Sequence, residues 1–278
     1  PIKPLPLREV VLINWIGFFA IFALPLRLGE FARPALTKLR HGVSVSAGIG
    51  TVAVERVLDG LMTSFCVAWA LFVLPRRVVD DPLARALPGY GLAALALLTC
   101  AFLALGVFLW KRAWAVRTTE RVIGIVSKGL AGFLATKVGG VADGLKTLAD
   151  PRLAFGFVLE TALYWASNAF GMWLLAQGCG LELSFGQAVG VMGILAIGIL
   201  LPAGPGLFGS FQLAVTLALQ LFFASEIVSG AGAIYVFLLF VIQAIGIVLA
   251  GVIPLLAMRL RLADLMPRLD GLTSEGAG

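Results

Sequence analysis

The chain has 278 residues, of which 60% are hydrophobic and only 13% charged, and its mean hydropathy is +1.01. Soluble domains carry roughly 25% charged residues, so this composition excludes a soluble globular protein and indicates an integral membrane protein. The formal net charge is +6. Because lysine and arginine gather on the cytoplasmic side of membrane proteins, this excess does not imply nucleic-acid binding. Backbone groups inside a bilayer must be paired within their own segment, so the long apolar runs predict an all-α, polytopic fold.

Seven segments of one transmembrane domain, 1–278, follow one another along the chain. In chain order we expect a re-entrant segment over 10–39, membrane-spanning helices over 47–74 and 89–110, a cytoplasmic amphipathic segment over 111–152, a spanning helix over 153–176, a second re-entrant segment over 188–224, and a spanning helix over 231–258. The chain begins with proline rather than methionine, and we expect further helices upstream.

The distribution of charge gives the expected orientation. The segment 111–152 contains eight of the 21 basic residues, with apolar residues at helical spacing, which predicts a helix held against anionic lipids on the cytoplasmic face. A solvated helix packed on the protein is the alternative. The apolar run 188–201 would reach about 21 Å as a helix, short of the roughly 30 Å core of a bilayer. A re-entrant hairpin over 188–224 satisfies both observations and places the C-terminus in the cytoplasm.

The two interrupted segments resemble each other. GFFAIFALP at 17–25 and GILAIGILLP at 193–202 share Gly, Ala-Ile and Leu-Pro, and a Gly-x-Phe follows each within ten residues. Paired broken segments of opposite orientation are typical of transporters built from inverted repeats, whose binding sites lie where the broken helices meet. Chance similarity in a sequence rich in Leu, Ala and Gly is the alternative.

Charged residues follow the first of these interruptions. Pro25 should end the preceding helix, and Gly29 allows backbone angles that other residues avoid, so a new helix should open near Gly29 or Glu30. Arg27 and Arg33 would then pair with Glu30 or hold an anionic group such as a lipid phosphate, which suits the fork of a guanidinium. The alternative is that these arginines extend to the cytoplasmic interface.

A second group of charges, Glu55, Arg56 and Asp59, lies within the apolar helix predicted over 47–74. Each charge costs at least about 2.5 kcal/mol at the centre of a membrane helix, so these side chains should face a cavity or a bundle interior. Arg56 can offset one carboxylate, and Arg27 or Arg33 could neutralise the other. A purely structural network of ion pairs is the alternative.

Polar residues in the later segments are further candidates. Glu160, Tyr164 and Asn168 share one helical face and predict a polar interior lining. Gln212 is a weaker candidate, because helix–helix hydrogen bonding explains it equally well.

The sequence GPGLFG at 204–209 formally matches GxGxxG. No strand precedes it and it contains a proline, so a dinucleotide site is not expected. The apex of a hairpin followed by a new helix is the better interpretation, and the N-terminus of that helix would attract anions near Gly204 and Gly206. His41 has no neighbouring ligand set, and the three cysteines lack CxxC spacing, which predicts buried structural thiols rather than a metal or redox site.

Together, RLGEFAR at 27–33, ERVLD at 55–59 and PAGPGLFG at 202–209 resemble the lysylphosphatidylglycerol synthase transmembrane region, a family of flippase-like inner-membrane proteins. The resemblance extends from Asn14 to Met258. It implies translocation of lipids between leaflets, best known for aminoacylated phosphatidylglycerol. Gln212 stands where many members carry an acidic residue, which leaves the lipid substrate open among phospholipids, aminoacyl-lipids and polyprenyl-linked or glycolipids.

These observations predict a lipid transporter of the inner (cytoplasmic) membrane that moves a lipid with a charged head group between leaflets, without catalysis, metal or bound cofactor. The alternative is a non-transporting scaffold for a lipid-modifying or glycosyl-transferring enzyme. Membrane lipid is the expected substrate, such an enzyme and a second copy of the chain are candidate partners, and nucleic acid is not. The expected substrate-binding residues are Arg27, Glu30, Arg33, Glu55, Arg56, Asp59, Glu160, Asn168, Gly204, Gly206 and Gln212.

Overall fold

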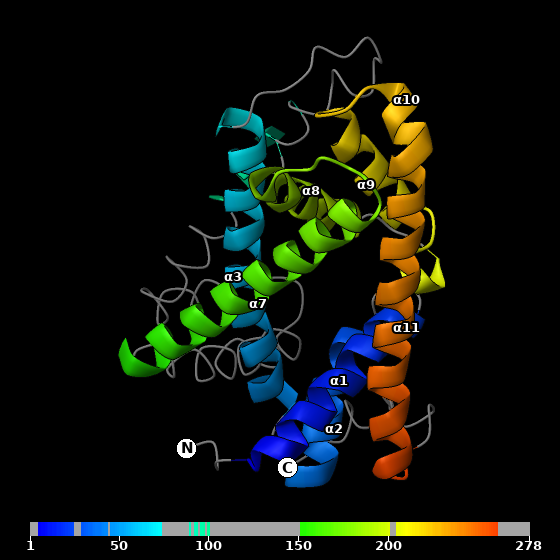
Figure 1. Cartoon of the computed structure of the whole chain (residues 1–278). Helices are drawn as coiled ribbons and strands as arrows, with labels where there is room; N and C mark the ends of the chain where they lie inside the picture. The colour runs from blue at the N-terminus through cyan, green and yellow to red at the C-terminus, as the bar shows by residue number, and fades with distance from the viewer. Residues whose placement is uncertain are drawn as a thin grey trace, which may run out of the picture. The chain divides into compact units, whose positions relative to one another are not determined.

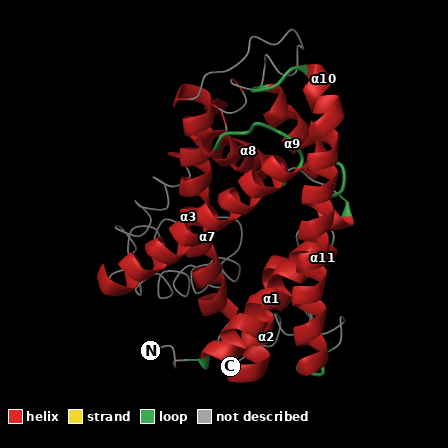
Figure 2. Ribbon diagram, viewed as in Figure 1, coloured by secondary structure: helices red, strands yellow, loops and turns green. Residues whose placement is uncertain are grey.

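The structure, a computed structural model, describes residues 5–24, 29–43, 45–73, 151–200 and 204–260, together with 89, 92–93, 95–97 and 99–100. All regular secondary structure in these ranges is helical (Figure 2), which confirms the all-α prediction. The elements are α1 (Leu7–Ala23), α2 (Ala32–His41), α3 (Val45–Ala68), the π-helix η2 (Trp69–Val73), α7 (Pro151–Gly178), α8 (Phe185–Gly198), the 3-10 turn η4 (Pro205–Leu207), α9 (Ser210–Gln220), α10 (Ser225–Ile227), the π-helix η5 (Val228–Gly232) and α11 (Ala233–Ala257) (Figure 1).

The long helices differ in their apolar character. Of the described helices, the continuous stretch Ser225–Ala257 is long and apolar enough to cross a membrane. Helices α3 and α7 have 24 and 28 residues, or about 36 and 42 Å, but their charged and polar side chains lower their hydropathy. The described residues of 89–100 are helical, while nearly all of the predicted segment 111–152 lies outside the described residues. How many segments cross the bilayer therefore stays a prediction.

The chain divides into two compact units. The first contains α1, α2, α3 up to Arg56 and α11 from Ile247 onward, and the second contains the rest of α3 and α11, nearly all of α7, and α8, α9 and α10.

In the first unit, α1 and α2 form an antiparallel helical hairpin (Figure 1). Helix α1 ends at Ala23, where the backbone of Leu24 becomes extended and its N–H still donates to the carbonyl of Ala20 at 2.9 Å. Residues 29–31 form a 3-10 turn before α2 begins at Ala32. The predicted interruption is thus observed, although Pro25 itself lies outside the described residues. The apolar core of this hairpin includes Ile16 and Leu36, both fully buried, and Leu255 from α11 also packs there.

Residue 29, in the turn that precedes α2, is a glycine because the backbone of α1 passes very close to it. A Cβ atom on Gly29 would lie 2.0 Å from the carbonyl carbon of Ala20 and 2.1 Å from the nitrogen of Ile21. Both are backbone atoms of α1, which cannot rotate away as a side chain can. Residue 29 must therefore be glycine for the turn to rest on α1, a reason that comes from packing.

The second unit contains a similar hairpin, made by α8 and α9. Gly198 of α8 faces Ala214 in the first half of α9. Gly190, two turns earlier in α8, lies against Ala70, and a Cβ there would also lie 3.6 Å from Cζ of Phe222, just after the end of α9, so the two helices run antiparallel. Helix α8 begins with a capping box, because Ser184 accepts from the N–H of Gln187 and donates its own N–H to the side chain of Gln187.

Helix α8 also lies against the end of α3. A Cβ on Gly193 would come within 2.6 Å of Cβ of Cys66 and 3.0 Å of its carbonyl carbon. The absence of a side chain there lets the two helix backbones approach closely, as small residues do in membrane helix packing. Elsewhere in the unit, α9 packs on η5. The apolar core of this unit contains Leu183, Val215 and Tyr235, all almost completely buried.

The connection between α8 and α9 has the turn chemistry expected of a hairpin apex. Gly206 and Gly209 have φ of 79° and 91°, values that favour glycine, and η4 lies between Gly204 and Phe208. Helix–break–helix architecture is therefore observed at both interrupted segments. That the hairpins turn back within the membrane, and that they form an inverted repeat, stay predictions.

Candidate functional site

The centre of the candidate site is the side chain of Arg33, which links three helices of the first unit. Its Nη1 donates to Oδ1 of Asn14 on α1 at 2.9 Å, and its Nη2 forms a charged hydrogen bond with Oε2 of Glu55 on α3. Since guanidinium carries only donors, the oxygen of the Asn14 amide must face it. The second arginine of the RLGEFAR motif thus contacts the glutamate of the ERVLD motif, 22 residues away along the chain.

The position of Arg33 in α2 and a glycine on α1 explain how its side chain reaches Asn14 and Glu55. The residue lies in the first turn of α2, and its carbonyl accepts a hydrogen bond from Oγ1 of Thr37 at 2.8 Å. Its aliphatic stem crosses α1 at Gly17, where an added Cβ would lie 2.2 Å from Cγ and 2.6 Å from Cδ of Arg33. Gly17 is one helical turn after Asn14, so one face of α1 provides both the space for the stem and the acceptor for the guanidinium.

The Arg33–Glu55 pair is mostly buried, but the side chain of Glu55 is partly exposed. The Arg33 side chain is 11% exposed and that of Glu55 is 30% exposed. In such surroundings the attraction between the two charges is stronger than in water, and neither charge can be left alone without cost. The partial exposure of Glu55 leaves a side from which an ion or a lipid head group could reach the pair. A guanidinium in this setting can exchange a carboxylate for a phosphate, because both fit its planar fork.

Glu30 and Arg56, the other predicted residues of this unit that the structure describes, are both half-buried. Each has a polar interaction in the structure. Arg27 lies outside the described residues. The sequence left open whether Arg27 or Arg33 neutralises a carboxylate of α3, and the structure shows Arg33 paired with Glu55.

The remaining predicted residues lie in the second unit, with individual surroundings. Asp59 accepts a hydrogen bond from the indole N–H of Trp165 at 3.3 Å, which ties α3 to α7. Glu160 is exposed, and the amide of Asn168 donates to the carbonyl of Tyr164 on its own helix at 2.8 Å. The role of the predicted polar stripe as an interior lining stays a prediction.

The apex of the second hairpin gathers Gly204, Gly206 and Gln212. Gly204 is exposed and Gly206 is half-buried. The side-chain oxygen of Gln212 accepts the N–H of Gly209 at 2.7 Å and so caps the first turn of α9. Gln212 thus has a structural task here, and a contact with substrate stays a prediction for all three residues.

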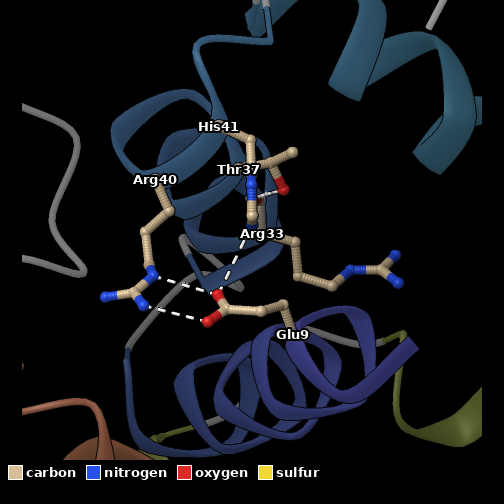
Figure 3. Close-up of polar contacts among 5 residues, drawn as sticks. All are labelled: Glu9, Arg33, Thr37, Arg40 and His41. Atoms are coloured by element: carbon tan, nitrogen blue, oxygen red, sulfur yellow. Dashed lines mark hydrogen bonds and ion pairs between the residues drawn. The ribbon is translucent and has the colours of Figure 1, made fainter. Parts of the chain in front are cut away.

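A second ionic cluster, formed by Glu9, Arg40 and His41, closes the other end of the α1–α2 hairpin. Arg40 donates from Nε and Nη2 to the two carboxylate oxygens of Glu9, both at 3.0 Å, and Nε2 of His41 lies 3.4 Å from Oε2. In Figure 3, Arg40 and His41 point to Glu9, whereas the side chain of Arg33 extends away from it. This cluster joins the first turn of α1 to the last turn of α2.

We expect the Glu9 cluster to give a small, pH-dependent stabilisation. Glu9 precedes the apolar part of α1, and the hydrogen bond from Arg40 holds the pKa of its carboxyl below the ordinary value of 4.5. A lowered carboxyl pKa stabilises the fold above the ordinary value, and this contribution is lost as pH falls through the lowered pKa. Thermal unfolding of the parent protein and Glu9→Gln should therefore differ by no more than about 1 kcal/mol at neutral pH and converge in acid. A difference that grows toward acid would contradict this.

Sequence reasoning missed Asn14 and Trp165 as partners of the charged residues. Asn14 is a polar residue in an apolar helix and lies one turn before Gly17, a signal that could have identified it. Trp165 gives no such signal, because a tryptophan in a membrane helix has many ordinary explanations.

The chain matches a known protein family. The family model described as the lysylphosphatidylglycerol synthase TM region matches residues 2–251. No curated protein and no solved structure matches the chain.

Proposed function

Because the chain belongs to the family of the lysylphosphatidylglycerol synthase TM region, and is thus a membrane protein with a lipid-related role, we propose that it moves a lipid with a charged head group between the leaflets of the cell membrane. The head group would enter a polar site around Arg33 while the acyl chains stay in the bilayer. The proposed orientation places the C-terminus in the cytoplasm.

The Arg33–Glu55 pair is the single observation that carries this proposal. Charged side chains within apolar helices are costly, and in membrane proteins they mark the pathways of ions and substrates. This pair joins two of the three sequence motifs, RLGEFAR and ERVLD, on which the resemblance to the family rests. It also presents a guanidinium, the group best suited to a lipid phosphate, beside a carboxylate that could receive an amine.

The broken helices support the same function. In the two hairpins one helix ends and the next begins after 8 and 11 residues, 24–31 and 199–209. Interrupted membrane helices line the binding sites of transporters. That the apex at 204–209 also contacts lipid is part of the proposal.

Transfer of labelled lipids in proteoliposomes tests the proposal. Purified protein is reconstituted with lipids that carry a fluorescent acyl chain and differ only in head group, and a membrane-impermeant quencher reports how much label reaches the outer leaflet. We expect the parent protein to accelerate the transfer of at least one phosphate-bearing lipid. Arg33→Ala should lower that rate by at least about tenfold, since one charge-assisted contact contributes roughly 1.5–3 kcal/mol.

Arg40→Ala is the matched control, because Arg40 also belongs to α2 and also pairs with a glutamate, but outside the proposed site. Its transfer rate should stay within about twofold of the parent value. If Arg33→Ala transfers lipid as fast as the parent, the proposed site is wrong. If the parent moves none of the lipids, the alternative of a non-transporting scaffold gains support.

A further inference from the structure

We infer that Asn14 binds the phosphate of the transported lipid together with Arg33, while Glu55 stays paired with the guanidinium. The inference rests on the lipid-moving function proposed above and adds a specificity-determining residue to its site. It follows from the hydrogen-bond donors of Asn14 and Arg33 that have no acceptor within the described part of the chain.

The guanidinium of Arg33 has more donors than its two partners use. A guanidinium carries five N–H groups. One on Nη1 donates to Asn14 and one on Nη2 donates to Glu55, so three of the five have no acceptor among the residues that the structure describes. A phosphate can therefore bind Arg33 without displacing Glu55, and the ion pair between α2 and α3 stays intact.

The side-chain amide of Asn14 places further donors beside this guanidinium. Its oxygen accepts from Nη1 of Arg33 at 2.9 Å. Its nitrogen is bonded to the same carbon as that oxygen, so the nitrogen lies within about 5 Å of Nη1. Within the described ranges this nitrogen has no hydrogen-bond partner, although Asn14 is half-buried in the apolar helix α1. Polar groups in such surroundings are costly unless an acceptor satisfies them.

A phosphate is the lipid group that fits these donors. Its unbridged oxygens accept hydrogen bonds and donate none, and each can take a donor at about 2.8 Å, so one phosphate can contact two donor groups that lie this close together. An amine has no acceptor to offer them. Glu30 and Arg56 have polar interactions of their own and are not counted among the available donors.

The ion pair favours this mode of binding over displacement of the carboxylate. A phosphate that took the place of Glu55 would leave a mostly buried carboxylate without its counter-charge, which is costly. A phosphate that uses the remaining N–H groups of Arg33 and the amide of Asn14 avoids this cost. The partly exposed side chain of Glu55 stays available to an amine of the same head group.

Nuclear magnetic resonance of the asparagine side chains tests the inference directly. The chain has two asparagines, Asn14 and Asn168, so isotopic labelling of asparagine gives a spectrum with two side-chain amide groups. The full chain in detergent is titrated with a short-chain phosphatidylglycerol below its micelle concentration, and separately with a diacylglycerol of equal chain length, which lacks the phosphate. We expect the amide protons of Asn14 to shift downfield with phosphatidylglycerol and not with diacylglycerol.

Asn14→Asp assigns the signal and separates phosphate binding from the positioning of Arg33. A carboxylate of nearly the same shape still accepts from Nη1, so the variant should resist unfolding by sodium dodecyl sulfate at least as well as the parent. It has lost the amide donors and carries a negative charge in their place. Its Kd for phosphatidylglycerol should therefore rise by at least about tenfold. A residue that is only structural would show no loss of affinity in a variant of undiminished stability.

Gln187→Glu is the matched control. It makes the same change from amide to carboxylate in the capping box of α8, where glutamate serves as well as glutamine. Its Kd for phosphatidylglycerol should stay within about twofold of the parent value.

The outcomes separate this inference from the proposed function. If the parent binds and transfers phosphatidylglycerol while the amide of Asn14 does not respond, or if Asn14→Asp binds it as tightly as the parent, the inference is wrong and the function stands. The expected response without transfer of any lipid supports the phosphate site and overturns the function. A parent that transfers only another phosphate-bearing lipid is titrated with a short-chain form of that lipid and judged by the same signals. Absence of binding and transfer for every such lipid overturns both.

Discussion

Replacing Arg33 by methionine is expected to lower the free energy of unfolding by about 2–3 kcal/mol. Breaking a buried ion pair on one side costs roughly 3–5 kcal/mol, because the remaining charge has no partner. The 30% exposure of the Glu55 side chain reduces this cost, since the carboxylate is not fully enclosed by protein. Methionine retains an apolar stem over Gly17, so the loss reports the ion pair and the hydrogen bond to Asn14 rather than the packing. Unfolding by sodium dodecyl sulfate in mixed micelles, followed by circular dichroism, measures it.

The double variant Arg33→Met with Glu55→Gln shows how much of the lost stability comes from leaving Glu55 without its counter-charge. Once the carboxylate is neutral, it no longer needs a counter-charge, and we expect the double variant to recover at least about half of the stability lost by Arg33→Met. Asn14 still lacks its donor in the double variant, so recovery should be incomplete. If the effects of the two single changes simply add, Arg33 and Glu55 do not depend on each other and the proposed site loses its basis.

Replacing Gly29 by alanine is expected to have the second large effect, on both stability and transfer. The new Cβ would overlap the carbonyl carbon and oxygen of Ala20, at 2.0 and 2.3 Å in the present structure. Because these are backbone atoms, the turn must move away from α1, which we expect to cost about 2–3 kcal/mol. The movement displaces the start of α2 and with it Arg33. Lipid transfer should therefore fall by about tenfold or more, since small misplacements of a positioned group are costly.

Gly171→Ala is the control for Gly29→Ala. Gly171 lies within α7, and a Cβ there would meet no atom within 4 Å. Alanine is the better helix former by up to about 1 kcal/mol, so this variant should be as stable as the parent or slightly more stable. Comparable losses in the two variants would show that the effect of Gly29→Ala does not come from its contact with α1.

Much of the candidate site could be predicted from sequence because charges are conspicuous in an apolar chain. Glu55 was expected to be functional from the cost of its charge in a membrane helix, and Arg33 from its place after a broken helix and the fit of its guanidinium to a phosphate. Arg27 or Arg33 was identified as able to neutralise a carboxylate of the second motif. Asn14 was not identified as a partner, because a single amide carries no such electrostatic demand. The partner of Asp59, Trp165, is 106 residues away along the chain, beyond the range of any local pattern.

Gly29 shows the limit of local reasoning in a different way. Its presence in the motif suggested freedom of backbone angle, whereas the structure shows that α1 passes so close that no side chain fits. Both explanations demand glycine at the same position. Only the position of α1 relative to the turn shows that space itself is limiting.

The sequence by itself determined the membrane class, the all-helical architecture and the two interruptions, because hydropathy, helix length and the effects of proline and glycine act within a few neighbouring residues. The tertiary structure decided which arginine meets which carboxylate, that Asn14 holds the guanidinium, and that Gly17 and Gly29 make room for close contact. Those facts depend on which faces of α1, α2 and α3 come together. Residues 14, 33 and 55 lie too far apart along the chain for any periodicity to bring them to one point.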